Sequence, residues 1–190
     1  MTTLIYLHGL NSSGLSHKAG VLRERMEPIP VLAPTYPAHR PDAAIAALTD
    51  CLARLPGAAP PLVVGSSMGG FYGQYVARRS RFAHLFMINP ALTPWDLMAA
   101  YVGQTMTTAG GETYTVTPEL IGHTRPYGVA DPCDGTPTTL FLDKGDEVID
   151  YRIAANLYSH CGRLMIFAGG DHAFQHLDEA IAVIREAAER

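Results

Sequence analysis

The sequence predicts a three-layer α/β domain built on a mostly parallel sheet of about six strands. Six short apolar runs recur along the chain, and a turn signal follows each of them. Stretches with helical periodicity separate most of these runs. The length of 190 residues suits a domain of ordinary size, so we expect one domain over residues 1–190.

The predicted strands are short and apolar, as is typical of strands that are buried on both faces of a parallel sheet. They are Leu4–Leu7, Val31–Ala33, Leu62–Val64, Leu85–Ile88, Thr139–Leu142 and Leu164–Phe167. The predicted helices carry apolar residues at helical spacing, and Pro41 suits the first turn of one of them. They are His17–Met26, Pro41–Leu55, Met68–Arg79, Tyr151–Tyr158 and His176–Ala188.

Residues 91–137 interrupt this alternation between the fourth and fifth predicted strands. We expect a short helix over Pro94–Tyr101, a hairpin that turns at Gly110-Gly111, and a helical turn at Pro118–Gly122. A connection of this length is usually functional. The pattern therefore predicts a lid-like insertion over residues 91–137, and the alternative is a decorated connection without a role.

Composition and charge exclude several classes of protein. With 47% hydrophobic and 17% charged residues, the chain has enough apolar material for a core and too much for disorder. A net charge of −4 without long runs of one sign argues against nucleic-acid binding. The N-terminus lacks a basic leader, and the run Leu4–Leu7 is far too short to span a membrane. We expect a cytoplasmic protein without a membrane partner, and nothing in the sequence indicates an oligomeric state.

The three cysteines, Cys51, Cys133 and Cys161, are odd in number and widely spaced. No CxxC pair occurs, which argues against a zinc knuckle or a thioredoxin-like site. Disulfides are rare in cytosolic proteins. We therefore expect three reduced thiols.

The most informative motif is Gly65-Ser66-Ser67-Met68-Gly69, which fits G-x-S-x-G with Ser67 at its centre. It follows an apolar strand and precedes a helical stretch, which is the setting of a nucleophile elbow. Small residues are needed two positions before and after the serine, because strand and helix nearly touch at this strained turn. Ser66 lacks this frame, since its +2 residue is Met68. We predict that Ser67 is the nucleophile, and the alternative is a glycine-rich turn that binds a phosphate or nothing.

A nucleophilic serine needs a general base. After an elbow of this type, the catalytic residues follow along the chain in the order Ser, then Asp or Glu, then His. The acid and the histidine each lie just past the carboxyl end of a later strand. His172 follows the last predicted strand after Gly169-Gly170, so we predict that it is the base. His176 lies four residues after His172, so the two could bind a metal ion together from one face of a helix. The sequence offers no evident third ligand, so we expect no metal.

The base in turn needs an orienting acid, and three aspartates lie close together after the fifth predicted strand. Asp143 is near the strand, and Asp150 reads as a helix N-cap. Asp146 is followed by Val148-Ile149, which would anchor its loop in the core. We predict that Asp146 is the acid.

An oxyanion hole needs two backbone N–H donors. The residue after the nucleophile, Met68, supplies one of them. The loop after the first strand supplies the other, and we predict Leu10, with Asn11 in reserve.

The stretches YLHGLNSSG, VGSSMGGFYG, INPAL, GDEVIDY and GGDHAF together resemble the YqiA-type family of small bacterial esterases, within the α/β-hydrolase superfamily. The match runs from the first strand to His172, nearly the whole chain. The resemblance implies an α/β-hydrolase fold that lacks the two leading strands of larger members. It also implies a serine hydrolase that acts on esters, with Ser67, Asp146 and His172 at the matching motifs.

We therefore predict a carboxylic ester hydrolase that forms an acyl-serine, needs no cofactor, and acts on a small-molecule acyl ester. Within residues 91–137, four side chains are expected to line an acyl pocket, unless they only pack the insertion onto the body. They are Trp95, Leu97, Met98 and Tyr101.

Three alternatives remain at this point. An acyl thioesterase or an acyltransferase would use the same three residues. A non-catalytic binding module could share the fold, although a complete triad argues against it. A dehalogenase or a dienelactone-type hydrolase would want Asp or Cys at position 67, where this chain has serine.

Overall fold

A computed structural model describes residues 2–55, 59–133 and 135–189, so residues 1, 56–58, 134 and 190 of the expected 1–190 domain lie outside it. The strands of its main sheet are β1 (Leu4–Leu7), β2 (Val31–Leu32), β3 (Leu62–Ser66), β4 (His84–Ile88), β7 (Thr138–Asp143) and β8 (Gly162–Phe167). Within these ranges they form a six-stranded sheet in the order β2-β1-β3-β4-β7-β8, and every neighbouring pair is parallel. The predicted sheet is confirmed.

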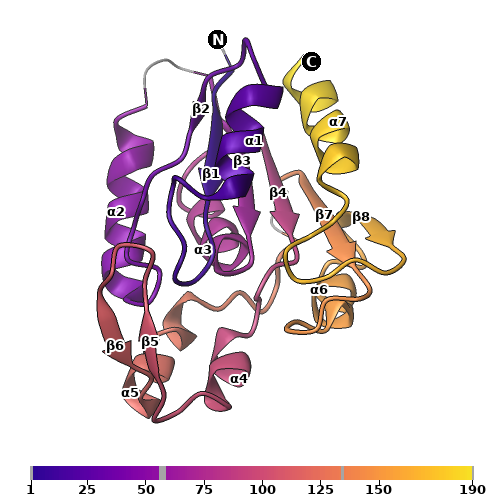
Figure 1. Ribbon diagram of the computed structural model, residues 1–190. Coiled ribbons are helices and arrows are strands. Elements are labelled where there is room, and N and C mark those ends of the chain that lie inside the picture. The colour runs from indigo at the N-terminus through magenta and orange to yellow at the C-terminus, as the bar shows by residue number, and fades with distance from the viewer. Residues whose placement is uncertain (1, 56–58, 134, 190) are drawn as a thin grey trace.

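Helices cover both faces of this sheet and make the three layers (Figure 1). The helices are α1 (His17–Arg25), α2 (Pro41–Ala53), α3 (Met68–Ala77), α6 (Tyr151–Leu157) and α7 (Leu177–Ala188). Side chains alternate along β1, so that Ile5 and Leu7 pack with α2, α3 and α6, whereas Leu4 and Tyr6 pack with α1 and α7. Two apolar cores therefore lie on opposite faces of one sheet.

Residues 91–137 form a separate group at the carboxyl edge of the sheet (Figure 1). The group contains α4 (Pro94–Ala99), the antiparallel pair β5 (Thr105–Thr107) and β6 (Thr113–Thr115), α5 (Pro118–Gly122), and a 3₁₀ turn at Arg125–Tyr127. The predicted hairpin and both short helices are confirmed. A small core of Met98, Val116 and Ile121 holds the group together.

The two glycines that frame Ser67 lie where backbones touch. A Cβ atom on Gly65 would lie 2.4 Å from the carbonyl oxygen of Gly69, and a Cβ atom on Gly69 would lie 2.0 Å from that of Leu7. Both distances are far inside van der Waals contact. Strands β1 and β3 and helix α3 can therefore meet at Ser67 only because these positions carry no side chain.

The cysteines differ from expectation. Cys133 and Cys161 form a disulfide with their Cα atoms 5.5 Å apart, and Cys51 is free. The two partners are 28 residues apart in sequence, so no local spacing signal reveals them. The fold brings the loop before β7 to the start of β8, and the expectation of three reduced thiols is wrong for this pair.

In the described part of the chain, no helix combines the length and the apolar character that crossing a bilayer would require.

We predict that Gly69→Ala destabilises the protein by about 3 kcal/mol or more, because the new methyl group would force apart α3 and the end of β1. The matched control is Gly20→Ala in α1, where a Cβ atom meets nothing within 4 Å. Alanine there should stabilise the helix by about 1 kcal/mol. Urea unfolding of the two variants measures both effects, and equal unfolding midpoints would contradict the steric explanation.

Candidate active site

Ser67 occupies the tight turn between β3 and α3. Its backbone is left-handed, with φ 54° and ψ −118°, a conformation that costs a non-glycine residue about 1–3 kcal/mol. Hydrogen bonds fix this backbone on both sides. The Ser67 N–H donates to the Ile88 carbonyl at 3.0 Å, and the Ser67 carbonyl accepts from Gly70 at 3.0 Å and from Ala91 at 3.1 Å. The Ser67 hydroxyl is thereby held at the wall of a cavity.

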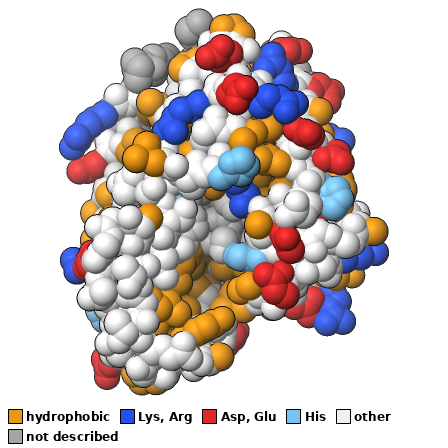
Figure 2. Space-filling model, in the orientation of Figure 1, with side chains coloured by type: hydrophobic (Ala, Val, Ile, Leu, Met, Phe, Trp, Pro, Cys, Tyr) orange, Lys and Arg blue, Asp and Glu red, His pale blue; other side chains and the backbone are white. Residues whose placement is uncertain are grey.

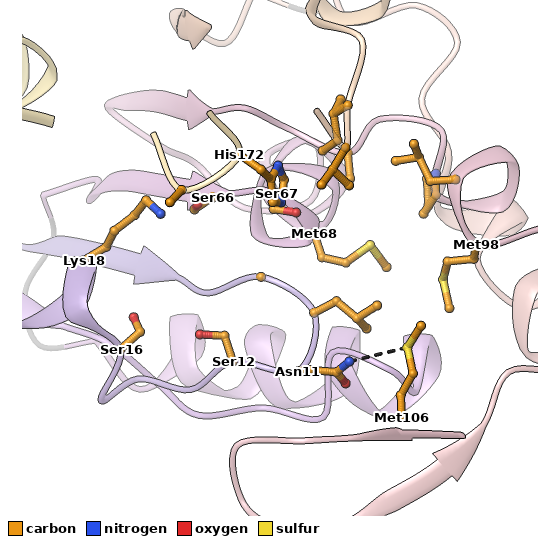
Figure 3. A pocket seen from close by; sticks show the side chains of 18 of the residues that line it. Asn11, Ser12, Ser16, Lys18, Ser66, Ser67, Met68, Met98, Met106 and His172 are labelled. Carbon is orange, nitrogen blue, oxygen red and sulfur yellow. Dashed lines mark hydrogen bonds between the residues drawn. The ribbon is translucent and has the colours of Figure 1, made fainter. Parts of the chain in front are cut away.

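His172 lies on the loop between β8 and α7 and lines the same cavity (Figure 3). Its Nδ1 atom is 2.9 Å from Oδ2 of Asp146. The Asp146 side chain is 1% exposed and the His172 side chain is 27% exposed, so a buried carboxylate holds a ring that still reaches the cavity. The structure thus brings together the predicted acid and the predicted base beside Ser67.

Hydrogen bonds from His172 and from two backbone N–H groups favour the ionised form of Asp146. Burial alone would raise the pKa of the carboxyl group, but three hydrogen bonds outweigh it and hold the pKa below its ordinary value. They come from His172, from the Ile149 N–H at 2.8 Å and from the Val148 N–H at 2.9 Å. Ile149 anchors this loop in the core as expected, whereas Val148 is 42% exposed and lines the cavity instead.

A second aspartate–histidine pair lies behind the first. Asp143 is fully buried at the end of β7, and its Oδ1 atom is 2.6 Å from Nδ1 of His176. Its Oδ2 atom accepts from the Gln175 N–H at 2.9 Å. The His176 ring stacks on Phe167 with 4.4 Å between ring centroids, and His176 is not among the residues that line the cavity. Asp143 therefore fastens the loop that carries His172 rather than facing a ligand.

Asn89 links Asp143 to the loop that carries His172. It follows β4 with a left-handed φ of 39°, and its side chain accepts from the Asp143 N–H at 2.9 Å. The same amide donates to the Asp171 carbonyl at 3.0 Å, one residue before His172. The loop that carries Asp146, the loop that carries His172 and the end of β4 are thus tied to one buried side chain.

Asp150, the other candidate acid, accepts from the Arg152 N–H as the predicted N-cap of α6.

The predicted oxyanion donors flank Ser67. Leu10 and Met68 both line the cavity. Across residues 2–55, 59–133 and 135–189, neither N–H has an acceptor. The loop that carries Leu10 touches the serine, since a Cβ atom on Gly9 would lie 3.2 Å from Cβ of Ser67. The backbone of Asn11, the reserve donor, is left-handed with φ 58°, and its side chain accepts from the Tyr114 hydroxyl at 2.9 Å.

His8 fixes the start of the loop that carries Leu10. It is fully buried, and its Nε2 atom accepts from the Tyr36 N–H at 3.2 Å, so the proton lies on Nδ1, which is 2.9 Å from the Gly9 carbonyl. The Tyr36 ring stacks on the imidazole at 4.2 Å, and its hydroxyl donates to the His8 carbonyl. Burial lowers the pKa of His8, because the charged form has no solvent around it.

The cavity has a volume of about 640 Å³, within the range of small-molecule sites. Figure 2 shows it as a hollow in the face of the molecule, with hydrophobic side chains in its lower part. Leu97, Met98 and Tyr101 line it, as does Met106 of β5. Trp95 does not, which corrects the expectation for that residue.

Trp95 lies on the other side of α4. Its ring packs edge-on against Phe71 with 6.2 Å between centroids, and the Arg125 guanidinium lies 5.4 Å from its centroid. Gly128 sits so close to the ring that a Cβ atom there would lie 2.7 Å from it. The tryptophan therefore packs the insertion onto α3, which is the alternative role considered for it.

The model of the uncharacterised protein family UPF0227 matches residues 3–188 of the chain. The chain belongs to UPF0227. This is the YqiA-like esterase family, so the resemblance drawn from the five motif stretches is confirmed.

Solved structures show that this UPF0227 chain has the α/β-hydrolase fold. Est1E from Butyrivibrio proteoclasticus, solved with ferulic acid, superposes with a TM-score of 0.77 at 16% identity, over 98% of this chain and 87% of that one. Alpha/beta hydrolase domain-containing protein 10 from mouse gives 0.76 at 15% identity, over 98% and 89%. A pyrethroid hydrolase from Sphingobium faniae gives 0.65 at 16% identity, over 99% and 97%.

Several residues of the UPF0227 site escaped the sequence reasoning. Asn89 and the Asp143–His176 pair act through contacts between strand ends that are far apart in sequence, and only the topology shows them. Lys18 lines the cavity from α1, although its helix precedes the motif by some fifty residues. The INPAL stretch that contains Asn89 was a signal, since polar residues at the carboxyl ends of parallel strands gather at one edge.

We predict that His8 makes the fold sensitive to acid. Its folded-state pKa is lowered, so the unfolded chain binds more protons below its ordinary pKa of about 6.5, and stability falls as the pH drops through that window. His8→Gln should lose less stability between pH 7.5 and pH 5.5 than the wild type, as measured by urea unfolding at both pH values. His160→Gln, at an exposed position, is the control and should behave like the wild type. A wild-type-like acid loss in His8→Gln would contradict this role.

Proposed function

We propose that this protein hydrolyses carboxylic esters through an acyl-serine intermediate on Ser67. The observation that carries the proposal is the hydrogen bond between Asp146 and His172, which orients an imidazole at the cavity that also holds the Ser67 hydroxyl. Along the chain, the nucleophile, the acid and the base follow one another in the order expected for an α/β-hydrolase. Membership of the YqiA-like esterase family and the fold of the structural neighbours support the same activity.

In the first half-reaction, His172 takes the proton of Ser67 as the serine oxygen bonds to the acyl carbon. Nδ1 of His172 faces Asp146, so Nε2 is the nitrogen that receives this proton. The ionised Asp146 then stabilises the imidazolium. Imidazolium donates the same proton to the departing alcohol, the carbon–oxygen bond breaks, and an acyl-serine remains.

The oxyanion that forms in this step needs donors placed in advance. The N–H groups of Leu10 and Met68 flank Ser67 and have no acceptor elsewhere in the described chain. Aimed at the developing charge, each donor of this kind is worth about 10²–10³ in rate. In the second half-reaction, water activated by His172 attacks the acyl-serine and releases the acid through the same oxyanion hole.

The apolar part of the cavity accepts the acyl chain. Leu97, Met98 and Tyr101 of the insertion face Met68 and Ile149 of the body across it. Contacts with the oxyanion loop fix the insertion, since the Ala109 N–H donates to the Asn11 carbonyl at 2.9 Å. Residues 91–137 thereby act as a cover that keeps water from the acyl chain.

A fluorophosphonate probe tests the nucleophile. The wild type should label, and Ser67→Ala should not, because the probe bonds to an activated serine. Hydrolysis of a p-nitrophenyl butyrate substrate should fall by about 10⁴–10⁶-fold in the same variant. In-gel fluorescence and initial rates measure the two effects.

Ser66→Ala is the matched control for this experiment. Ser66 is the neighbouring serine; it is buried as the last residue of β3 and precedes the centre of the elbow. This variant should still label. Labelling that survives Ser67→Ala, or a folded wild type that never labels and never hydrolyses an ester, would reject the proposed mechanism in favour of another nucleophile or a binding module.

A further inference from the structure

The cavity has a second, polar end that the reaction at Ser67 does not use. In Figure 3, Lys18, Ser12, Ser16 and Ser66 lie on one side of Ser67, whereas Met68, Met98 and Met106 lie on the other. Tyr6 and His17 complete the polar end. Figure 2 shows basic and histidine side chains at the upper margin of the hollow, above its apolar part.

Lys18 is the cation of this end, and it makes no salt bridge with the residues that the structure describes. It is the second residue of α1 and is partly buried, with its side chain extending towards Ser66 (Figure 3). No carboxylate of the described residues lies within ion-pair distance of its ammonium group. Burial lowers the pKa of Lys18, and the more distant charge of Asp171 offsets part of that shift. Because Asp171 offsets only part of the effect of burial, a further anion that reaches this ammonium group would stabilise its charged form.

The other groups of the polar end suit an anion as well. Ser12 and Ser16 carry hydroxyl groups that can donate to oxygen. The Tyr6 hydroxyl lies close to Ser16 and Ser66, and burial raises its pKa, which favours the protonated form. Two acidic side chains also lie near this end, and one buried carboxylate oxygen of Asp171 has no hydrogen-bond partner among the described residues. Glu147 lines the cavity and accepts from the His172 N–H at 3.1 Å. Asp171 accepts from the Gln175 side chain at 2.8 Å.

The polar end lies on the side from which the alcohol leaves. In Figure 3, Lys18 lies on the side of Ser67 and His172 that is away from the methionines, and it interacts electrostatically with Asp171, the residue directly before His172. The departing alcohol must also lie on that side, because it takes its proton from His172. The acyl chain then occupies the opposite end, which Met68, Met98 and Met106 line.

We propose that Lys18 binds an anionic group on the alcohol portion of the substrate, so that the preferred esters carry a carboxylate or a phosphate there. This inference rests on the proposed function, because it assigns the leaving-group side of the same site. Charge-assisted hydrogen bonds of this type are about twice as strong as neutral ones. Lys18 is thus a specificity-determining residue, not a member of the proton-transfer machinery.

The test compares three acetyl esters that share one ring: those of 4-hydroxybenzoate, of 4-hydroxyphenyl phosphate, and of the neutral 4-hydroxybenzamide. We expect Lys18→Gln to lower kcat/KM for an anionic ester about 10-fold, mostly through KM, and to change the neutral ester less than about 2-fold. Comparing variants on each ester cancels the intrinsic reactivity of the leaving groups. The carboxylate and phosphate esters show which anion the end accepts.

Two further variants separate local from general charge effects. Lys18→Arg should keep most of the preference, because it keeps the cation. Arg163→Gln removes an exposed cation from β8, an edge strand of the sheet. It should leave kcat/KM unchanged for all three esters. Equal losses on anionic and neutral esters in Lys18→Gln, or the same selectivity loss in Arg163→Gln, would overturn the proposal.

A binding measurement tests the anion site independently of the proposed esterase activity. Calorimetry of Ser67→Ala with 4-hydroxybenzoate should give a Kd that rises about 10-fold when Lys18→Gln is added, with 4-hydroxybenzamide unaffected. A wild type that hydrolyses none of the three esters contradicts the esterase activity. A wild type that hydrolyses them without regard to charge, and binds both ring compounds alike with and without Lys18, contradicts only the anion site.

Discussion

The contact on which the rest of this structure depends is the meeting of three backbones at Ser67. Strand β1 passes so close to helix α3 that only glycine fits at position 69, and α3 lies so close to the end of β3 that only glycine fits at position 65. The same approach forces Ser67 into a left-handed conformation and turns its hydroxyl towards the cavity. The local strain is sustained by the surrounding core, which buries both faces of the sheet.

Parallel topology then delivers the remaining groups to that point. The carboxyl ends of β1, β4, β7 and β8 share one edge of the sheet, so their loops converge although they are far apart in sequence. The hydrogen bonds of Asn89 tie the ends of β4 and β7 to the loop before His172. Each loop is held by a buried polar side chain at its base: His8 for the oxyanion loop, and Asp143 for the base loop. The reacting groups themselves remain at the cavity.

Much of this could be predicted from the sequence, because the signals were local. Apolar runs with turn signals predicted the sheet, and the spacing of glycines around Ser67 predicted the tight turn between β3 and α3. What escaped depends on long-range contacts. The Cys133–Cys161 disulfide and the Asp143–His176 pair join segments about thirty residues apart in the sequence. The Trp95 ring packs against Phe71 and Gly128 and not into the cavity. Helical periodicity alone could not distinguish the two sides of so short a helix.

The most direct measurement of the central claim is a crystal structure of the protein after reaction with an alkyl fluorophosphonate. We expect the phosphorus on Oγ of Ser67 and its free oxygen about 3 Å from the backbone nitrogens of Leu10 and Met68, because those N–H groups should bind the oxyanion. The alkyl chain should lie along Met98 and Met106. Phosphorus on any other residue, or an oxygen directed away from both N–H groups, would contradict the proposed role of the elbow.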